Sequence, residues 1–129
     1  MISIDVKKKI SCPISSPKVK KSLRTFLMKK GIVSDSVISV AIVDEKDMKL
    51  IAKKYLKEVG KPAHNVLSFV DSEVKKFAEP PDGKIHLGEI VICYPVLEKE
   101  AKSQGKLIDE KAIELVEHSA LHLLGIHHN

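Results

Sequence analysis

The sequence contains few of the residues on which several common kinds of site depend. Its two cysteines, Cys12 and Cys93, lie far apart and form no C-x-x-C pair, which excludes the usual thiolate metal and redox motifs. We expect both thiols to stay reduced in a cytosol. Arg24 is the only arginine, so nearly all of the positive charge comes from lysine, which attracts phosphate as a point charge without the bidentate fork of arginine.

Long apolar runs are also missing. No stretch of the sequence approaches the roughly 18 apolar residues of a membrane span. The N-terminus alternates Ile2, Ile4 and Val6 with polar residues before three lysines, which is the wrong order for a signal peptide. We therefore expect a soluble, cytoplasmic protein that makes no use of a membrane.

The length and composition are those of one globular domain. The chain has 129 residues, of which 43% are hydrophobic and 30% are charged, so we expect a single domain over residues 1–129. The formal net charge is +5 and the pI is about 9.1. This surplus suits a polyanionic partner such as nucleic acid but does not require one.

Hydrophobic periodicity predicts an α/β (α+β) fold in the order β, α, β, α, β, β, α, α, with a mixed sheet of about four strands and helices packed on it. Strands are expected at residues 2–7, 37–43, 65–70 and 87–93. Helices are expected from Ser15 to Gly31, from Asp44 to Gly60 and Pro62, from Pro95 to about Ser103, and from Leu107 or Ile108 into the C-terminal tail. Residues 71–84 are expected to form a loop or hairpin connection.

The C-terminal tail carries the pattern H-x-x-x-H-x-x-G-x-x-H, formed by His118, His122, Gly125 and His128. Two histidines four positions apart share one face of a helix, and Gly125 can take the left-handed conformation that ends the helix. Zinc binds imidazole nitrogen, and a catalytic zinc site has three protein ligands and one open position. We therefore predict a metal site made of His118, His122 and His128 on the last helix.

Alternatives to this site remain open at the sequence level. A histidine-rich tail can be an incidental surface, and His127 could replace His128 as the third ligand. The same spacing occurs in metalloproteases, which need a glutamate after the first histidine as general base. Ser119 occupies that position and disfavours peptide hydrolysis by this mechanism, whereas metal-activated water can attack a phosphodiester without such a residue.

The tail from His118 to His128 resembles the H-G-x-L-H-L-x-G-Y-D-H signature of the YbeY family of endoribonucleases. Two segments upstream add to the resemblance. Residues 65–69 are similar to the T-D-V-L-S-F segment of that family, and residues 87–93 are similar to its G-D-I-V-I strand. The order and spacing of the three segments agree with the family across nearly the whole chain.

The resemblance implies a small α/β domain with a three-histidine zinc site, nickel being a possible substitute. It implies cleavage of single-stranded RNA in 16S rRNA 3′-end maturation and ribosome quality control, with the 16S precursor and the small ribosomal subunit as partners. By position, the resemblance makes His118, His122 and His128 the metal ligands. It places Glu89 and His127 next to these ligands, where they would support them without binding the metal. No catalytic residue is assigned, and Lys57 and Ser68 are weak candidates.

The sequence departs from the family pattern at several positions. Leu56 follows Tyr55 where the family has an arginine, so Lys54 or Lys57 would have to replace it. Four further positions differ from the family: Glu89 and His127 each stand where it has an aspartate, Ser119 where it has a glycine, and Val70 where it has a proline. The sequence stops at Asn129, where fraying could weaken the metal site. The missing arginine and the short tail motivate an alternative function, a ribosome-associated assembly or binding module with a structural metal and little catalysis. The oligomeric state is not indicated.

Overall fold

The computed structural model describes residues 2–32, 35–70 and 85–125. In chain order, the elements are β1 (Ile2–Lys8), α1 (Ser16–Lys29), β2 (Ser36–Val43), α2 (Glu45–Leu56), β3 (Val66–Val70), β4 (Ile85–Cys93), α4 (Tyr94–Gln104) and α5 (Ile108–Leu123). This order confirms the α/β (α+β) prediction with its four strands. The predicted connection at residues 71–84 lies outside the described residues.

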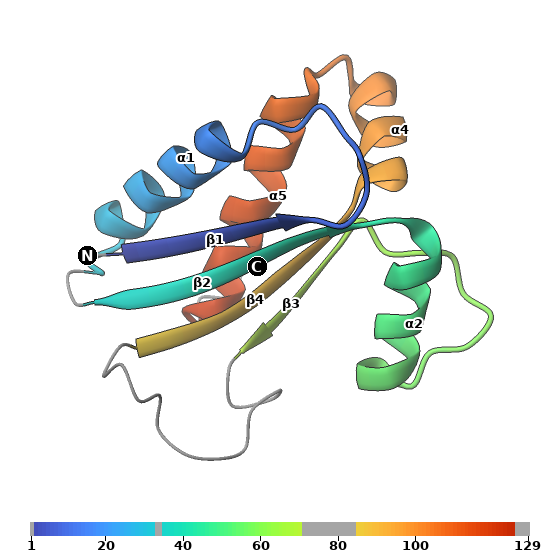
Figure 1. Cartoon of the computed structure of the whole chain (residues 1–129), viewed down its shortest axis with the longest axis horizontal. Coiled ribbons are helices and arrows are strands. Elements are labelled where there is room, and N and C mark those ends of the chain that lie inside the picture. The colour runs from blue at the N-terminus through green and yellow to red at the C-terminus, as the bar shows by residue number, and fades with distance from the viewer. Residues whose placement is uncertain (1, 33–34, 71–84, 126–129) are drawn as a thin grey trace.

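The four strands form one mixed sheet in the order β1-β2-β4-β3. β1 pairs with β2 and β2 pairs with β4 in parallel, whereas β3 pairs antiparallel with β4. β3 is therefore an edge strand, and it runs in the direction opposite to that of its neighbour β4 (Figure 1).

Helices cover the two faces of the sheet unequally (Figure 1). The larger core lies between the sheet and helices α1 and α5, and it includes Ile38, Ile90 and Val116. A smaller core lies under α2 and includes Met48 and Val91. Because side chains alternate along a strand, neighbouring residues of β4 contribute to opposite cores, which explains why the central strands are mostly apolar.

Local capping chemistry places the helix starts where the sequence predicts them. The Ser15 side chain accepts from the backbone N–H of Lys18 at the start of α1 (3.3 Å), and Asp44 accepts from that of Asp47 at the start of α2 (2.8 Å). At the other end of the chain, Gly125 has a φ of 77° and its N–H bonds to the carbonyl of His122. This geometry ends α5 at the glycine, as the tail pattern predicts.

The predicted end of α2 was wrong by a few residues. The helix ends at Leu56 rather than near Gly60, and Lys57 takes the left-handed conformation with a φ of 57°. The N–H groups of Lys57 and Glu58 both bond to the carbonyl of Ala52, which completes the cap. A residue with a β-carbon is unfavourable in the left-handed conformation, so the sequence rules for helix ends favour glycine at this position. They therefore predict that the helix ends at Gly60 rather than before Lys57.

Replacing Lys57 with glycine should raise the free energy of unfolding by about 1 kcal/mol, because glycine adopts the left-handed conformation without steric cost. The measurement is urea denaturation of both proteins. Lys54→Gly, inside α2, should instead destabilise by about 1 kcal/mol. A Lys57→Gly protein no more stable than the wild type would contradict the capping argument.

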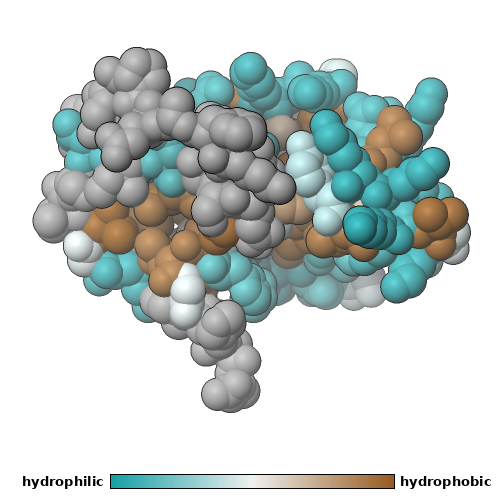
Figure 2. All heavy atoms as spheres, turned by 90° about the horizontal axis from the view of Figure 1, so that it is seen from below, coloured by the Kyte–Doolittle hydropathy of each residue, from teal (hydrophilic) through white to brown (hydrophobic). Residues whose placement is uncertain are grey.

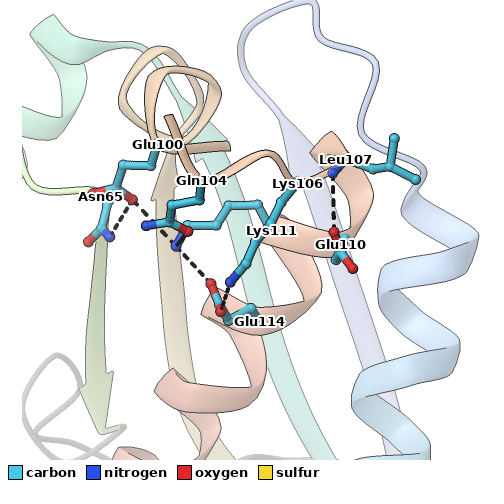
Figure 3. Close-up of polar contacts among 8 residues, drawn as sticks. All are labelled: Asn65, Glu100, Gln104, Lys106, Leu107, Glu110, Lys111 and Glu114. Atoms are coloured by element: carbon cyan, nitrogen blue, oxygen red, sulfur yellow. Dashed lines mark hydrogen bonds and ion pairs between the residues drawn. The ribbon is translucent and has the colours of Figure 1, made fainter. Parts of the chain in front are cut away.

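A buried lysine joins α4 to α5. The Lys111 side chain is 7% exposed, and its Nζ donates to Glu114 Oε2 at 2.7 Å and to Gln104 Oε1 at 3.0 Å (Figure 3). Glu100 lies 3.9 Å from the same Nζ and accepts from Asn65 Nδ2, just before β3. The buried charge is thus fully partnered, as burial requires, and the network fixes the first half of α5 against α4.

The Glu114 carboxylate gives this network a pH dependence. Hydrogen bonds from Lys106 and then Lys111 lower its pKa from 4.5 to about 2. A lowered folded-state pKa stabilises the protein above pH 4.5 and ceases to do so as the pH falls toward 2. Because the side chain is 44% exposed, solvent screening limits the contribution to about 1 kcal/mol.

We therefore expect Glu114→Gln to lower the free energy of unfolding by about 1 kcal/mol at pH 7 and by much less at pH 2.5. Urea denaturation at both pH values measures the difference. Asp5→Asn, at an exposed position on β1, is the matched loss of a carboxylate and should have little effect at either pH. An equal deficit for Glu114→Gln at both pH values would exclude the ion pair as its cause.

Candidate metal site at the end of the last helix

His118 and His122 lie together on the exposed side of α5, as the four-residue offset requires. Their Nε2 atoms are 3.4 Å apart, and the two rings meet edge to face with centroids 5.0 Å apart. The two nitrogens are therefore within hydrogen-bonding distance, and they also point close enough together to share a third partner.

The separation of the two nitrogens fits zinc. Imidazole nitrogen lies about 2.0 to 2.1 Å from zinc, and two ligands of a tetrahedral site are then about 3.3 Å apart. The observed 3.4 Å agrees with this separation. His122 also lies in the last turn of α5, where the negative end of the helix dipole favours a cation.

The predicted third ligand cannot be placed. His127 and His128 lie outside the described residues. Within residues 2–32, 35–70 and 85–125, no group of three or more histidine, cysteine, aspartate or glutamate side chains could hold a metal ion. Binding by His118, His122 and His128 therefore stays a prediction, for which the described structure supplies the first two side chains.

An acidic hollow of about 410 Å³ adjoins His118 on its α1 side. Three glutamates line it, Glu110, Glu114 and Glu117, together with Phe26. Burial raises the pKa of Glu117 against the opposing effect of Lys29, whereas Glu114 is held ionised by its lysines. Sequence reasoning missed this hollow, although Glu114 precedes His118 by four residues, a helical spacing that places the two side chains side by side.

Ser68 and Glu89 come from neighbouring strands but occupy opposite faces of the sheet. Ser68 pairs with Ile90, whose side chain lies in the core beneath α5. Glu89 pairs with Phe69, which lies in the core beneath α2. Ser68 is therefore on the side of the sheet that carries the histidines, while Glu89 is exposed on the other side. The structure does not bring Glu89 to the pair, and its supporting role stays a prediction.

The remaining candidates lie around the end of α2 or inside α5. Lys57 and Lys54 are exposed, and Lys54 Nζ lies 5.2 Å from the centroid of the Tyr55 ring. Leu56, at the position of the family arginine, is 43% exposed. Ser119 is 2% exposed, so its hydroxyl is not available to a substrate.

No helix in the described part of the chain combines the length and the apolar character needed to cross a membrane.

Comparison with known proteins identifies the family. A family model described as Endoribonuclease YbeY matches residues 3–129. A protein named Endoribonuclease YbeY from Stutzerimonas stutzeri is 38% identical over 94 residues, which are 73% of this chain and 55% of that protein. Another of the same name from Acinetobacter baumannii is 33% identical over 130 residues, covering 98% of this chain and 80% of that protein.

A solved structure shares the fold. The solution structure of TM1509 from Thermotoga maritima aligns with a TM-score of 0.57 and 23% identity, over 100% of this chain and 75% of that one. At this identity the likeness concerns the fold alone. The family model covers nearly all of the chain and the relatives agree with it, so the resemblance seen in the three sequence segments is confirmed. The chain belongs to the YbeY endoribonuclease family.

Proposed function

We propose that this protein is a zinc-dependent endoribonuclease that cleaves single-stranded RNA in the cytoplasm. The proposed biological role is late maturation of the 16S rRNA 3′ end on the small ribosomal subunit, together with ribosome quality control. The observation that carries the chemistry is the pair of Nε2 atoms 3.4 Å apart on one helix of a YbeY-family chain. Nickel could occupy the same imidazole site, since imidazole suits both metals.

His118 and His122 are the described residues that would hold the ion, each through Nε2, with His128 as the proposed third ligand. A bound zinc ion supplies Lewis acidity toward a phosphoryl oxygen and lowers the pKa of its water toward 7. Both histidines are exposed, so a phosphodiester can reach them without any opening of the core.

The charges around the pair disfavour an approach across the hollow on its α1 side. Glu110, Glu114 and Glu117 line this hollow, but Glu114 is already paired with Lys106 and Lys111, so the carboxylates left to repel a phosphate backbone are those of Glu110 and Glu117. Ser68 of β3 lies on the same side of the sheet as α5. In this proposal, Ser68 contacts the RNA near the histidines. Lys57 or Lys54, at the end of α2 on the opposite face of the sheet, holds a more distant part of its backbone as a point charge.

A second candidate function is a ribosome-associated binding module with a structural metal and little catalysis. Leu56 favours it, because an exposed leucine at the end of α2 cannot neutralise a phosphate as an arginine would. In this alternative, His127 or another side chain closes the tetrahedron, and no position remains open for water.

The test uses tag-free protein, its metal content by elemental analysis, and one RNA oligonucleotide in single-stranded and duplex form. We expect about one zinc per chain, cleavage of the single strand, loss of cleavage after chelation, and recovery on adding zinc. Metal bound at full content without cleavage of either RNA would favour the binding module. Cleavage that persists in the metal-free protein would exclude the zinc mechanism.

A further inference from the structure

A second hollow lies far from the histidines, on the α2 side of the sheet. It has a volume of about 800 Å³ and is enclosed by α2, the loop from Glu58 to Ala63, and the start of α4. The histidine pair is on α5, which packs on the opposite face. The function of this hollow is therefore independent of the proposed cleavage site.

Apolar side chains are exposed around the hollow. Leu50 is 55% exposed and Val59 is 76% exposed, and both line it together with Pro62 and Val96. Figure 2 shows brown, apolar surface set among teal, hydrophilic surface at the end of the molecule where α2 lies. These brown areas are separate patches, so the apolar side chains form anchor points within a polar rim rather than a continuous face.

The rim of the hollow is strongly basic. Among the described residues that line it, five are lysines and two are glutamates, and the lysines come from α2, the following loop and α4. One of the two glutamates, Glu58, already has a partner: His64 Nε2 lies within hydrogen-bonding distance of its Oε1, at 2.7 Å. The free charge that an incoming ligand meets is therefore positive.

The combination selects among three classes of ligand. A membrane surface needs apolar groups that protrude, whereas these line a concavity. Single-stranded RNA would use the lysines but also needs aromatic stacking surfaces, and no aromatic ring is among the described lining residues. An acidic amphipathic segment places apolar side chains in the hollow and carboxylates against the lysines, so it uses both features.

We propose that this hollow docks an acidic amphipathic segment of a partner protein. The segment's apolar side chains contact Leu50, Val59 and Val96, and its carboxylates pair with Lys49 on α2 and Lys99 on α4. Such rim pairs are exposed, so they add specificity and association rate more than affinity, and salt weakens them.

The test is fluorescence anisotropy of the full-length protein with a labelled helical 16-residue peptide that has leucines on one face and glutamates elsewhere. We expect binding that Lys49→Glu with Lys99→Glu weakens by about tenfold or more, that Leu50→Gln weakens as well, and that rising salt reduces. A peptide with lysines in place of the glutamates should not bind. Lys7→Glu with Lys21→Glu is the matched control, since both of these lysines are exposed elsewhere, on β1 and α1.

The other ligand classes are tested with the same variants, using single-stranded RNA and vesicles rich in phosphatidylglycerol. Peptide binding that the paired substitution at Lys49 and Lys99 does not change overturns the proposal, and so does an absence of peptide binding. A loss of RNA or vesicle binding specific to these variants, without a loss of peptide binding, also overturns it. RNA cleavage should be unchanged in all of them, which separates this proposal from the proposed enzymatic function.

Discussion

Replacing His122 with alanine is expected to slow RNA cleavage by about a thousandfold and to lower zinc affinity by at least about tenfold. A catalytic metal contributes several kcal/mol of transition-state stabilisation, and about 4 kcal/mol corresponds to a thousandfold in rate. Removing a direct ligand should weaken metal binding at least as much as removing its supporting partners, which costs about 10- to 100-fold. The measurements are single-turnover cleavage and zinc occupancy at a fixed free zinc concentration.

The fold should survive this substitution, which makes the result interpretable. His122 is exposed on the surface of α5, and surface changes of this kind usually shift stability by less than about 0.5 kcal/mol. His118→Ala should behave in the same way, because its Nε2 is 3.4 Å from that of His122. His64→Ala is the matched control, since this half-buried histidine contacts Glu58 on the other side of the sheet.

These results would also decide between the two candidate functions. Loss of both zinc and cleavage in the two variants, with neither lost in His64→Ala, supports the enzyme. If the wild-type protein cleaves no RNA, and the two variants lose both zinc and binding to the small ribosomal subunit, the binding module is supported. Full zinc and full cleavage in both variants would mean that His118 and His122 are not the ligands.

Features with a local cause were predictable from the sequence. The caps at Ser15 and Asp44 depend on side chains that bond to backbone groups three residues away, and the nearly continuous apolar run of β2 follows from burial on both faces. The proximity of His118 and His122 is equally local, because helix geometry alone sets a four-residue offset.

Features that depend on distant parts of the chain were not predictable in the same way. The sequence around Lys111 is that of an ordinary surface lysine. The residue is buried because α4 packs against α5 and provides Gln104 and Glu100 as partners. The placement of Glu89 depends on which face of β4 receives α5 and which receives α2, and no local pattern decides this in a strand that is apolar on both sides.

Strand β4 also contains an irregularity that the sequence pattern did not reveal. Val37 of β2 pairs with His86, but Ile38 pairs with Gly88, so Leu87 is an extra residue. Gly88 has a φ of 145°, which side chains rarely adopt. This bulge shifts the register of the strand just before Glu89 and Ile90, and thereby determines which of them faces α5.

Replacing Gly88 with alanine is expected to lower the free energy of unfolding by about 3 to 5 kcal/mol. A β-carbon there would clash with the carbonyl oxygen of Phe69 and lie 2.8 Å from Leu123 Cδ2. Backbone strain of about 1 to 3 kcal/mol is added to overpacking of similar size. This loss is a large part of the about 5 to 15 kcal/mol that stabilises a typical domain, and urea denaturation measures it.

Gly105→Ala is the control without a clash, because Gly105 has a φ of 66° and, among the described residues other than its chain neighbours, no atom lies within 4 Å of its added β-carbon. It should cost only about 1 kcal/mol, the penalty of the left-handed conformation. An equal loss at both positions would show that packing against Phe69 and Leu123 contributes nothing. The contact with Leu123 also links stability to the site, because Leu123 adjoins His122 at the end of α5. The Gly88→Ala protein that remains folded should therefore bind zinc more weakly, since the added methyl group displaces the helix end that carries the ligand.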